Sequence, residues 1–447
     1  MKAWNGGVAA LVLLTLLGAA PRARADAAET ADRLFTGREA FSQPLPGLDE
    51  AERERFFRGR ALFNQSWVVA PARDDRVDGL GPLYNRLACV SCHAHNGRGL
   101  PPERAGERMQ AMLVRLSVAG VGPRGGPRPH PAYGDQFNEE GIPGVPGEGR
   151  VLLRWHTVRV HGACLRRPVL RFEDLAYGPL GPVLTSPRVG QQVVGMGLLD
   201  AVPAATLEAL AEAPKPDTVR GRVNRVWNPE TGATEVGRFG HKANMPSLRA
   251  QIAGAFLGDL GITSPLHPAE NCTPVQTACR RAPSGGAPEL SAQQLDEVTY
   301  YLAQLAVPPR RGADDPAVRR GEARFAALGC TACHRPMLRT GDSASPALAH
   351  QDIAPYTDLL LHDMGPGLAD GRPDFAAGGR EWRTPPLWGL GLTAAVSERA
   401  RYLHDGRARS LHEAILWHGG EATVARQRYA ALGAAGRAEL MAFLGSL

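Results

Sequence analysis

Hydrophobic residues recur at helical spacing in several parts of this chain, and each such part predicts an α-helix. The segments are 50–63, 291–305, 316–328, 410–418 and 436–447. The second is the best defined, because Ser291 and Gln294 have the spacing of a capping box and Pro308 lies just past its end. Residues 100–200, in contrast, are crowded with glycine and proline, which is typical of ordered loops with short pieces of structure. The pattern as a whole predicts a mainly α fold.

The same pattern divides the chain into two related parts. The sequence G-x-A-x-F occurs at 59–63 and again at 321–325, and each copy precedes a Cys-x-x-Cys-His motif. The distance to that motif is much longer in the first copy, so we infer that the first copy carries an insertion. A polar linker at 310–315 separates the two parts. We therefore predict an N-terminal module at 26–308, enlarged by long Gly/Pro-rich loops, and a C-terminal module at 309–447.

The first 25 residues have the pattern of a secretory signal peptide, 1–25. Lys2 provides a positive start, residues 8–20 form a short hydrophobic run, and residues 23–25 read A-x-A, a cleavage signal. The run is too short to span a bilayer, and no other stretch approaches the roughly 18 apolar residues that a span needs. We therefore expect cleavage near Ala25 and a secreted, periplasmic protein without a membrane span. An uncleaved amphipathic anchor is the alternative.

The two Cys-x-x-Cys-His motifs carry the main chemical signal. This motif attaches c-type haem: the thiols bond to the vinyl groups of the porphyrin, and the histidine becomes the proximal ligand of the iron. A thioredoxin-like redox pair and a zinc knuckle are the alternatives, but the histidine in both copies and the signal peptide favour haem. The predicted attachment residues are Cys89, Cys92 and His93 for the first haem, and Cys330, Cys333 and His334 for the second.

The predicted haems and signal peptide change how the composition and the net charge are interpreted. The 447 residues, 43% of them hydrophobic, suffice for two or three domains, but aromatic residues are only 6%, which is thin unless porphyrins complete the cores. The net charge of +6 suggests a polyanion such as nucleic acid. Three cations belong to the predicted signal peptide, which leaves +3, and each ferric haem subtracts about one more charge. We therefore expect no nucleic-acid partner.

Three of the seven cysteines remain after the haem motifs are assigned, and seven are too few for a disulfide scaffold. Cys272 and Cys279 lie close together in a proline-containing loop, and we predict that they form a disulfide. Cys164 is expected to be a small buried hydrophobe.

The ligand on the far side of each iron decides the function, because a six-coordinate haem transfers electrons whereas a five-coordinate haem can bind peroxide or O₂. His418 lies on the hydrophobic face at the end of the predicted 410–418 helix, so it is the leading candidate for the second haem. Met364 is the rival ligand, and a hydrogen-bonded core histidine is the structural alternative for His418. For the first haem no residue stands out, since His95 is too close to His93 to cross the ring. This favours an open first site.

Several long segments resemble the bacterial di-haem oxidoreductase family, whose members are labelled thiol oxidoreductases or peroxidases. The segments are GLGPLYNRLACVSCHAHNGRG, AYGPLGP, GRFGHKA, PYTDLLLHDMGPGLAD, EWRTPPLWGLG and LHDGRARSLHEAILWHGGEA. More distantly, the chain is similar to the di-haem cytochrome c peroxidases, the MauG-type enzymes and the haem rubber oxygenases. The resemblance implies two cytochrome c-like haem domains.

The resemblance to the peroxidases also implies roles for individual positions. Their second haem takes its distal ligand from the helix after an HDG motif; here that motif is 404–406, and the matching ligand is His418. The stretch 383–386 matches their segment that supplies carbonyl groups to a calcium ion, so Ca²⁺ is a further expected cofactor. His241 stands where they have a tryptophan between the haems, and Trp382 or Trp388 is the expected substitute.

Three further positions follow from the resemblance. Gln251 stands at the place of the peroxidases' active-site glutamine, Asp259 near that of their catalytic glutamate, and Phe256 near that of the distal phenylalanine of the rubber oxygenases. An ordinary solvated helix residue is the alternative for Gln251, and a surface turn residue is the alternative for Asp259.

Together these inferences predict an enzyme that reduces hydrogen peroxide at the first haem with electrons that arrive through the second. A donor cytochrome or cupredoxin and a small oxidant are the expected partners. A pure electron-transfer cytochrome, an oxygenase and a protein-modifying di-haem enzyme are the alternatives. The label of thiol oxidoreductase finds no support, because the cysteines outside the two motifs form no C-x-x-C pair.

Overall fold

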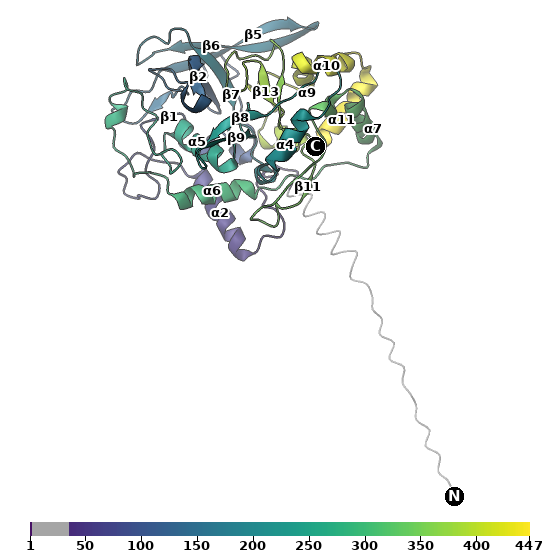
Figure 1. Ribbon diagram of the computed structural model, residues 1–447, viewed down its shortest axis with the longest axis horizontal. Coiled ribbons are helices and arrows are strands. Elements are labelled where there is room, and N and C mark those ends of the chain that lie inside the picture. The colour runs from purple at the N-terminus through teal and green to yellow at the C-terminus, as the bar shows by residue number, and fades with distance from the viewer. Residues whose placement is uncertain (2–34) are drawn as a thin grey trace.

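Helices and strands share the chain more evenly than the sequence pattern predicts (Figure 1). The computed structural model describes Met1 and residues 35–447. Of these residues, 29% are helical and 19% lie in strands, which form several small sheets. The prediction of a mainly α fold is therefore wrong. The predicted signal peptide, apart from Met1, lies outside the described residues, and no helix of the described part has the length and hydropathy to cross a membrane.

The longest of the unpredicted strands lie in the Gly/Pro-rich region. The larger ones are β2 (Met112–Val121), β5 (Arg150–Val160), β6 (Ala163–Glu173) and β7 (Leu184–Val189). β2 is the centre of a three-stranded sheet between β7 and β3 (Pro127–Arg128), and β5 and β6 form a long hairpin. The remaining strands pair as β1 (Leu83–Tyr84) with β4 (Glu140–Gly141), β8 (Asn224–Asn228) with β9 (Ala233–Gly237), β10 (Leu338–Arg339) with β11 (Asp352–Ile353), and β12 (Leu361–Asp363) with β13 (Glu381–Arg383).

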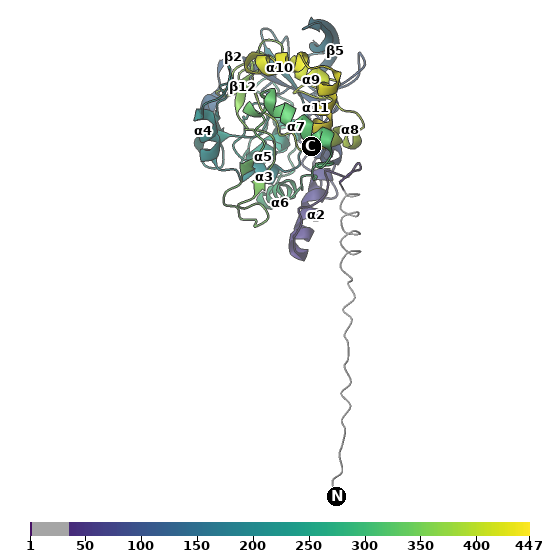
Figure 2. The same ribbon diagram turned by 90° about the vertical axis from the view of Figure 1, so that its right-hand side faces the viewer.

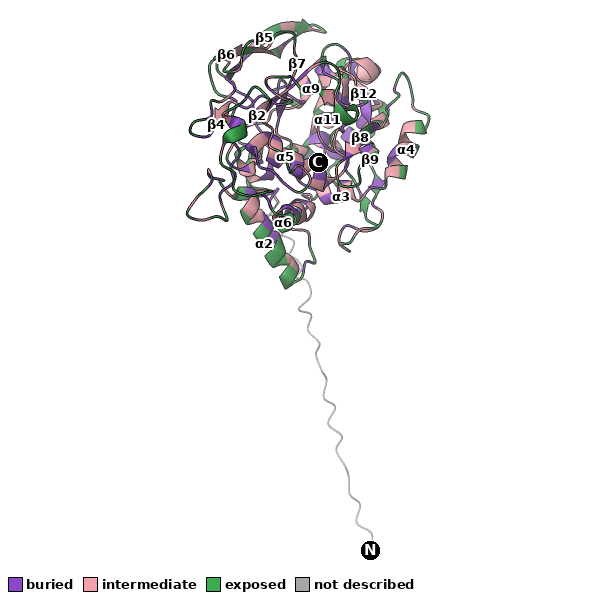
Figure 3. Cartoon of the chain, turned by 60° about the vertical axis from the view of Figure 1, so that its left-hand side comes forward, coloured by how far each residue is buried: buried purple, intermediate pink, exposed green. Residues whose placement is uncertain are grey.

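The β5–β6 hairpin shows why the hydrophobic pattern did not predict these strands. Its two-residue turn is His161-Gly162, and both residues have positive φ angles of 49° and 83°, as the tight hairpin turns that match strand twist require. Arginines occur on both faces of each strand and interrupt the hydrophobic alternation, so the strands do not stand out in the sequence. The hairpin edge carries many exposed residues (Figure 3). Cys164 is one of them, so the prediction that it is buried is wrong.

One arginine ties this hairpin to the C-terminal half of the chain. The Arg166 guanidinium donates to both carboxylate oxygens of Glu103 at 2.6 and 3.1 Å and to the carbonyl oxygen of Arg407 at 3.1 Å. It also lies 4.0 Å from the ring centroid of Trp155. The neighbouring Leu165 is buried in the C-terminal hydrophobic cluster. The hairpin is therefore attached to both halves of the molecule.

The predicted helices form close to their expected limits. They are α2 (Glu50–Asn64), α6 (Ala292–Ala303), α7 (Pro316–Ala327), α9 (Leu411–Trp417) and α11 (Ala434–Ser446). The capping box of Ser291 and Gln294 is confirmed. The others are α3 (Met196–Asp200), α4 (Ala204–Glu212), α5 (Leu248–Leu260), α8 (Thr393–Val396) and α10 (Thr423–Ala430). The disulfide between Cys272 and Cys279 is also confirmed.

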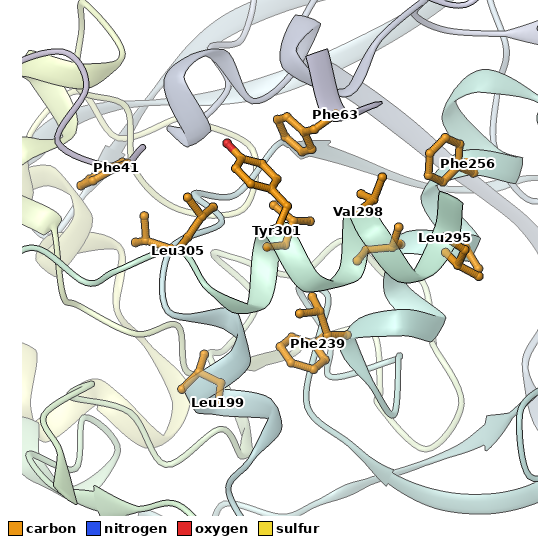
Figure 4. Close-up of a cluster of buried hydrophobic side chains, with 14 of the residues drawn as sticks. Phe41, Phe63, Leu199, Phe239, Phe256, Leu295, Val298, Tyr301 and Leu305 are labelled. Carbon is orange, nitrogen blue, oxygen red and sulfur yellow. The ribbon is translucent and has the colours of Figure 1, made fainter. Parts of the chain in front are cut away.

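The G-x-A-x-F repeat marks two equivalent helix crossings. Figures 1 and 2 show α2 beside α6 at one end of the molecule, and α7 beside α11 elsewhere. In the first crossing Phe63 packs on Tyr301, with ring centroids 5.5 Å apart (Figure 4). In the second, Phe325 packs on Phe443 at 5.2 Å. The glycine of each repeat, Gly59 or Gly321, lies where the paired helices touch.

We expect Gly321→Ala to destabilise the protein by about 1–3 kcal/mol, because an added Cβ atom would lie 2.0 Å from the carbonyl oxygen of Glu439. Urea unfolding of the holoprotein measures the loss. Gly436→Ala is the matched control: it lies in α11, where an added Cβ meets nothing closer than 3.4 Å, so better helix propensity is expected to leave stability unchanged or raised. Equal stability of the two variants would contradict the close crossing.

Candidate functional site

The two Cys-x-x-Cys-His motifs have the same local structure. Each begins with a 3₁₀ turn, at Cys89–Ser91 and Cys330–Ala332. In each, the backbone N–H of the histidine donates to the carbonyl oxygen of the first cysteine, at 3.0 and 2.9 Å. The phenylalanine of the preceding repeat lies beside each histidine ring, with centroids 6.3 Å apart in the first motif and 6.1 Å in the second. The repeat thus places two motifs in equivalent surroundings.

Hydrogen bonds orient three histidine rings in the same way. The Nδ1 atom of His93 lies 2.6 Å from the carbonyl oxygen of Gln191, and that of His334 lies 3.0 Å from the carbonyl oxygen of Tyr356. His418 makes the same contact with Ala414, at 2.7 Å. A carbonyl oxygen can only accept, so Nδ1 carries the proton in all three rings. This leaves Nε2 unprotonated, which is how a histidine ligand of a metal is usually held.

A cavity of about 260 Å³ joins the second motif to both of its candidate distal ligands. Cys330, Cys333 and His334 line it, and so do His418 and Met364. Most of the other lining side chains are apolar, among them Phe325, Leu328, Leu368, Leu390, Ile415 and Leu440. Two thiols, two imidazoles with available Nε2 atoms and an apolar wall fit a covalently attached haem. The contact of His418 with its own helix favours it over Met364, whose sulfur has no such orienting contact.

The thiols of both motifs are free and protonated. None of the four forms a disulfide. Burial raises the pKa of Cys89, Cys92 and Cys330 to about 12, and it also raises the pKa of Cys333. Redox-active C-x-x-C pairs depend on a lowered thiol pKa. The arrangement therefore does not fit a thioredoxin-like pair and fits attachment to a porphyrin.

Asp259 lies at the first motif, near the C-terminal end of α5. Its carboxylate is close enough to influence the pKa values of Cys89, Cys92 and His93. Burial raises the pKa of Asp259, against the opposing effects of Arg115 and of a 2.8 Å hydrogen bond from Gln136 Nε2. A carboxyl group with a raised pKa beside a haem motif is suited to exchange protons.

The other two residues that the resemblance picked out lie apart from Asp259. Gln251 is on the same helix but two turns earlier, roughly 12 Å along the axis, beside the turn that contains Gly240 and Asn244. Phe256 is 1% exposed and packs edge-on against Trp67, with ring centroids 6.0 Å apart (Figure 4 places it in the main core). No contact joins the three side chains among the interactions of the described residues. Of these three residues, only Asp259 combines a place beside the first haem motif with a raised pKa, which suits proton exchange.

Three aromatic rings form a row along the cavity of the second motif. The ring of Trp382 stacks on that of His404 at 3.7 Å and 12°, and it meets His241 edge-on at 6.4 Å. All three line the cavity of the second motif. His241 donates from Nε2 to the carbonyl oxygen of Val189 at 3.0 Å, two residues before the Gln191 carbonyl that orients His93. Burial lowers the pKa of His404 to about 3, so the ring is neutral.

Of the two tryptophans expected as substitutes, Trp382 is therefore the one in this row. Trp388 packs in the main core beside Gly195 instead.

His362 is a buried charged group that the sequence did not single out, although it lies in the PYTDLLLHDMGPGLAD segment. Asp358 Oδ2 lies 2.9 Å from its Nε2 atom, and Glu421 Oε2 lies 2.7 Å from its Nδ1 atom. Burial acts to lower the pKa of His362, but the hydrogen bonds to Asp358, Cys333 and Glu421 hold that pKa well above its usual value. The imidazolium therefore ties the loop of Cys333 to the strand β12.

The segment matched to a calcium site does not fit a cation. The carbonyl oxygen of Thr384 already accepts the hydroxyl of Thr357 at 2.6 Å and Nη1 of Arg383 at 3.2 Å. A guanidinium beside a carbonyl oxygen repels a divalent ion. In the part of the chain that the structure describes, no group of three or more His, Cys, Asp or Glu side chains is arranged to hold a metal ion.

Comparison with known proteins agrees with this geometry. The family model described as "Di-haem oxidoreductase, putative peroxidase" matches residues 24–118 and 181–447, so the part left out contains the β5–β6 hairpin. No curated protein matches the chain. Among solved structures, hydrazine synthase of Kuenenia stuttgartiensis, pressurised with 20 bar xenon, is 15% identical, with 99% of this chain and 100% of that chain covered and a TM-score of 0.35.

Proposed function

The chain belongs to the di-haem oxidoreductase family, and from that premise we propose that it reduces hydrogen peroxide at a first haem held by Cys89, Cys92 and His93. Electrons would arrive through a second haem held by Cys330, Cys333 and His334, with His418 as its distal ligand. The observation that carries the proposal is Asp259, a partly buried carboxyl group with a raised pKa beside the first motif. A pure electron carrier has no use for such a group.

The reaction takes up two electrons and two protons and releases two waters from each peroxide. The haems supply the iron that binds peroxide and hold the electrons. Asp259 takes the proton from the oxygen nearer the iron and gives it to the farther one, so that the leaving oxygen departs as water. The 2.8 Å hydrogen bond from Gln136 holds the carboxylate in place and favours its ionised, proton-accepting form.

The row of His241, Trp382 and His404 connects the two halves of the site. Stacked aromatic rings in van der Waals contact offer a short path for electrons between the motifs. The donor in this proposal is a periplasmic cytochrome or cupredoxin, and the protein itself is exported by the signal peptide at 1–25.

The experiment is a spectrum followed by an assay. Optical and EPR spectra of the purified ferric holoprotein are expected to show one high-spin haem that binds cyanide and one low-spin haem. Addition of hydrogen peroxide with reduced cytochrome c is then expected to oxidise two cytochromes per peroxide. Two low-spin haems that ignore cyanide in every redox state would establish an electron carrier instead, and consumption of O₂ without peroxide turnover would establish an oxygenase.

A further inference from the structure

Three arginine side chains line the cavity of the second motif without a carboxylate partner. Arg383 is 7% exposed, and its guanidinium donates only to neutral oxygens: the Gly240 and Thr384 carbonyls at 2.8 and 3.2 Å, and Gln191 Oε1 at 2.8 Å. Within the described residues, no ion pair involves it. The guanidinium is thus hydrogen-bonded but forms no ion pair, although Asp358 lies near enough to act on its pKa.

The side chains of the other two arginines make fewer hydrogen bonds. Arg426 of α10 is 8% exposed and makes no side-chain hydrogen bond or ion pair with any described residue. Its charge lowers the pKa of His418, after burial as the main cause, so it lies near that ring. Arg98 donates to the carbonyl oxygen of Leu403, and its buried Nε atom has no partner among the described residues. Burial lowers the pKa of both Arg98 and Arg383 to about 10, which leaves them charged at neutral pH.

Buried charges without counter-ions are strongly unfavourable, so such groups are normally paired. The carboxylates that act on Arg98 and Arg383 are those of Asp405 and Asp358, and both are already paired, with Arg407 and His362. Three guanidiniums without an ion-pair partner around one mostly apolar cavity therefore indicate that its occupant carries negative charge. The planar fork of arginine matches a carboxylate in two parallel hydrogen bonds. A haem joined to Cys330 and Cys333 brings two propionate carboxylates into this cavity.

We propose that Arg98, Arg383 and Arg426 are the carboxylate-binding groups of this cavity and hold the propionates of the second haem. The proposal rests on haem attachment at Cys330 and Cys333 and is independent of peroxide reduction. It also explains why the 383–386 segment does not fit calcium. The Arg383 guanidinium supplies the positive charge that a calcium ion would bring there, and it donates a hydrogen bond to the carbonyl oxygen of Thr384.

The first test uses the unaltered holoprotein, titrated potentiometrically at several pH values. A buried propionate without a cation has a raised pKa, and its ionisation makes the haem potential fall as pH rises through neutrality. Propionates paired with arginine stay ionised, so we expect a potential for the second haem that is constant between about pH 6 and 8. His241 and His404, with lowered pKa values, and His362, with a raised one, do not titrate in this window. A potential that falls across it would overturn the proposal.

Variants then identify the groups responsible. Arg383→Gln and Arg426→Gln are each expected to lower the potential of the second haem and to make it depend on pH, because an uncompensated propionate stabilises the ferric iron. Arg339→Gln is the charge-matched control: Arg339 pairs with the exposed Asp352 at 2.8 Å, and neither residue lines the cavity. Arg383→Lys and Arg426→Lys retain the charge and are expected to fall between wild type and glutamine.

Calcium is tested with the same measurement. Treatment of the wild-type holoprotein with EGTA is expected to leave the potential and the spectrum of the second haem unchanged. A shift on EGTA treatment as large as that of Arg383→Gln would assign the charge to calcium. If the glutamine variants have the same potential and pH profile as the Arg339→Gln control, the arginines do not bind the propionates.

Discussion

Replacing His418 by alanine is expected to convert the second haem from low spin to high spin and to open it to cyanide. The imidazole lines the same cavity as His334, and its Nδ1 atom is held by the Ala414 carbonyl oxygen at 2.7 Å, so Nε2 is the atom available to the iron. Alanine leaves no ligand at that position. EPR of the ferric holoprotein measures the change, and added imidazole is expected to restore the low-spin signal because it fills the space that the side chain left.

The matched control is His412→Ala, in the same helix. His412 bonds through Nδ1 to the hydroxyl of Tyr429 at 2.7 Å and does not line the cavity. Its removal is expected to leave the low-spin signal intact. If the His418→Ala spectrum also stays low spin, Met364 becomes the ligand to test, since its side chain lines the cavity as well. A low-spin double variant of His418 and Met364 would reject both candidates.

The parts of the fold that follow from local sequence were predictable. Helix α6 begins and ends as the capping box at Ser291 and the prolines after it indicate, because these signals act within one turn of the helix. The start of α9 is capped less completely. Ser410 accepts the backbone N–H of Glu413, but the Glu413 carboxylate binds the backbone N–H and side chain of Arg409 instead of the backbone N–H of Ser410.

The β5–β6 hairpin was not predictable in the same way, although a trace of it was visible. His161-Gly162 is a turn sequence between two stretches of equal length, but arginines occur on both faces of each strand and break the alternation of hydrophobic and polar residues. Burial of Val151 and Leu153 is decided by distant residues of the same cluster. Exposure of Cys164 follows from its place beside the turn of this hairpin, which the cysteine's usual preference for burial does not reveal.

The candidate site likewise has features that local sequence predicts and features that depend on distant residues. The Cys-x-x-Cys-His motifs and the helix that ends at His418 are local patterns and were identified directly. The aromatic row and the cavity arginines join residues far apart in the chain: Arg98 follows the first motif, whereas Arg383 lies in β13. No periodicity links such positions, and an arginine in a loop is usually a solvated one. Only packing of the two halves against each other reveals that these guanidiniums are buried and, among the described residues, have no ion-pair partner.

Replacing Asp259 by asparagine is expected to lower kcat/KM for hydrogen peroxide by about 10²- to 10⁴-fold, the usual contribution of a positioned proton-transfer group. Asparagine keeps an oxygen for the hydrogen bond from Gln136 but cannot take up a proton. The wild-type activity is expected to fall at acid pH, as Asp259 becomes protonated with a pKa above its ordinary value. The variant is expected to lose this acid limb. Stopped-flow assays with reduced cytochrome c across the pH range measure both effects.

The stability of Asp259→Asn shows whether a loss of activity comes from lost proton transfer or from unfolding. Because the pKa of Asp259 is raised in the folded protein, ionisation costs folding free energy as pH rises above the pKa of the unfolded chain. Asparagine removes that cost, so the variant is expected to be at least as stable as wild type at pH 7. Asp352→Asn is the control, since Asp352 is exposed and pairs with Arg339 at 2.8 Å, away from Asp259. A stable Asp259→Asn variant with wild-type turnover would exclude this carboxyl group as the proton carrier. A stable but inactive variant that still binds cyanide at the first haem would locate the defect in proton transfer alone.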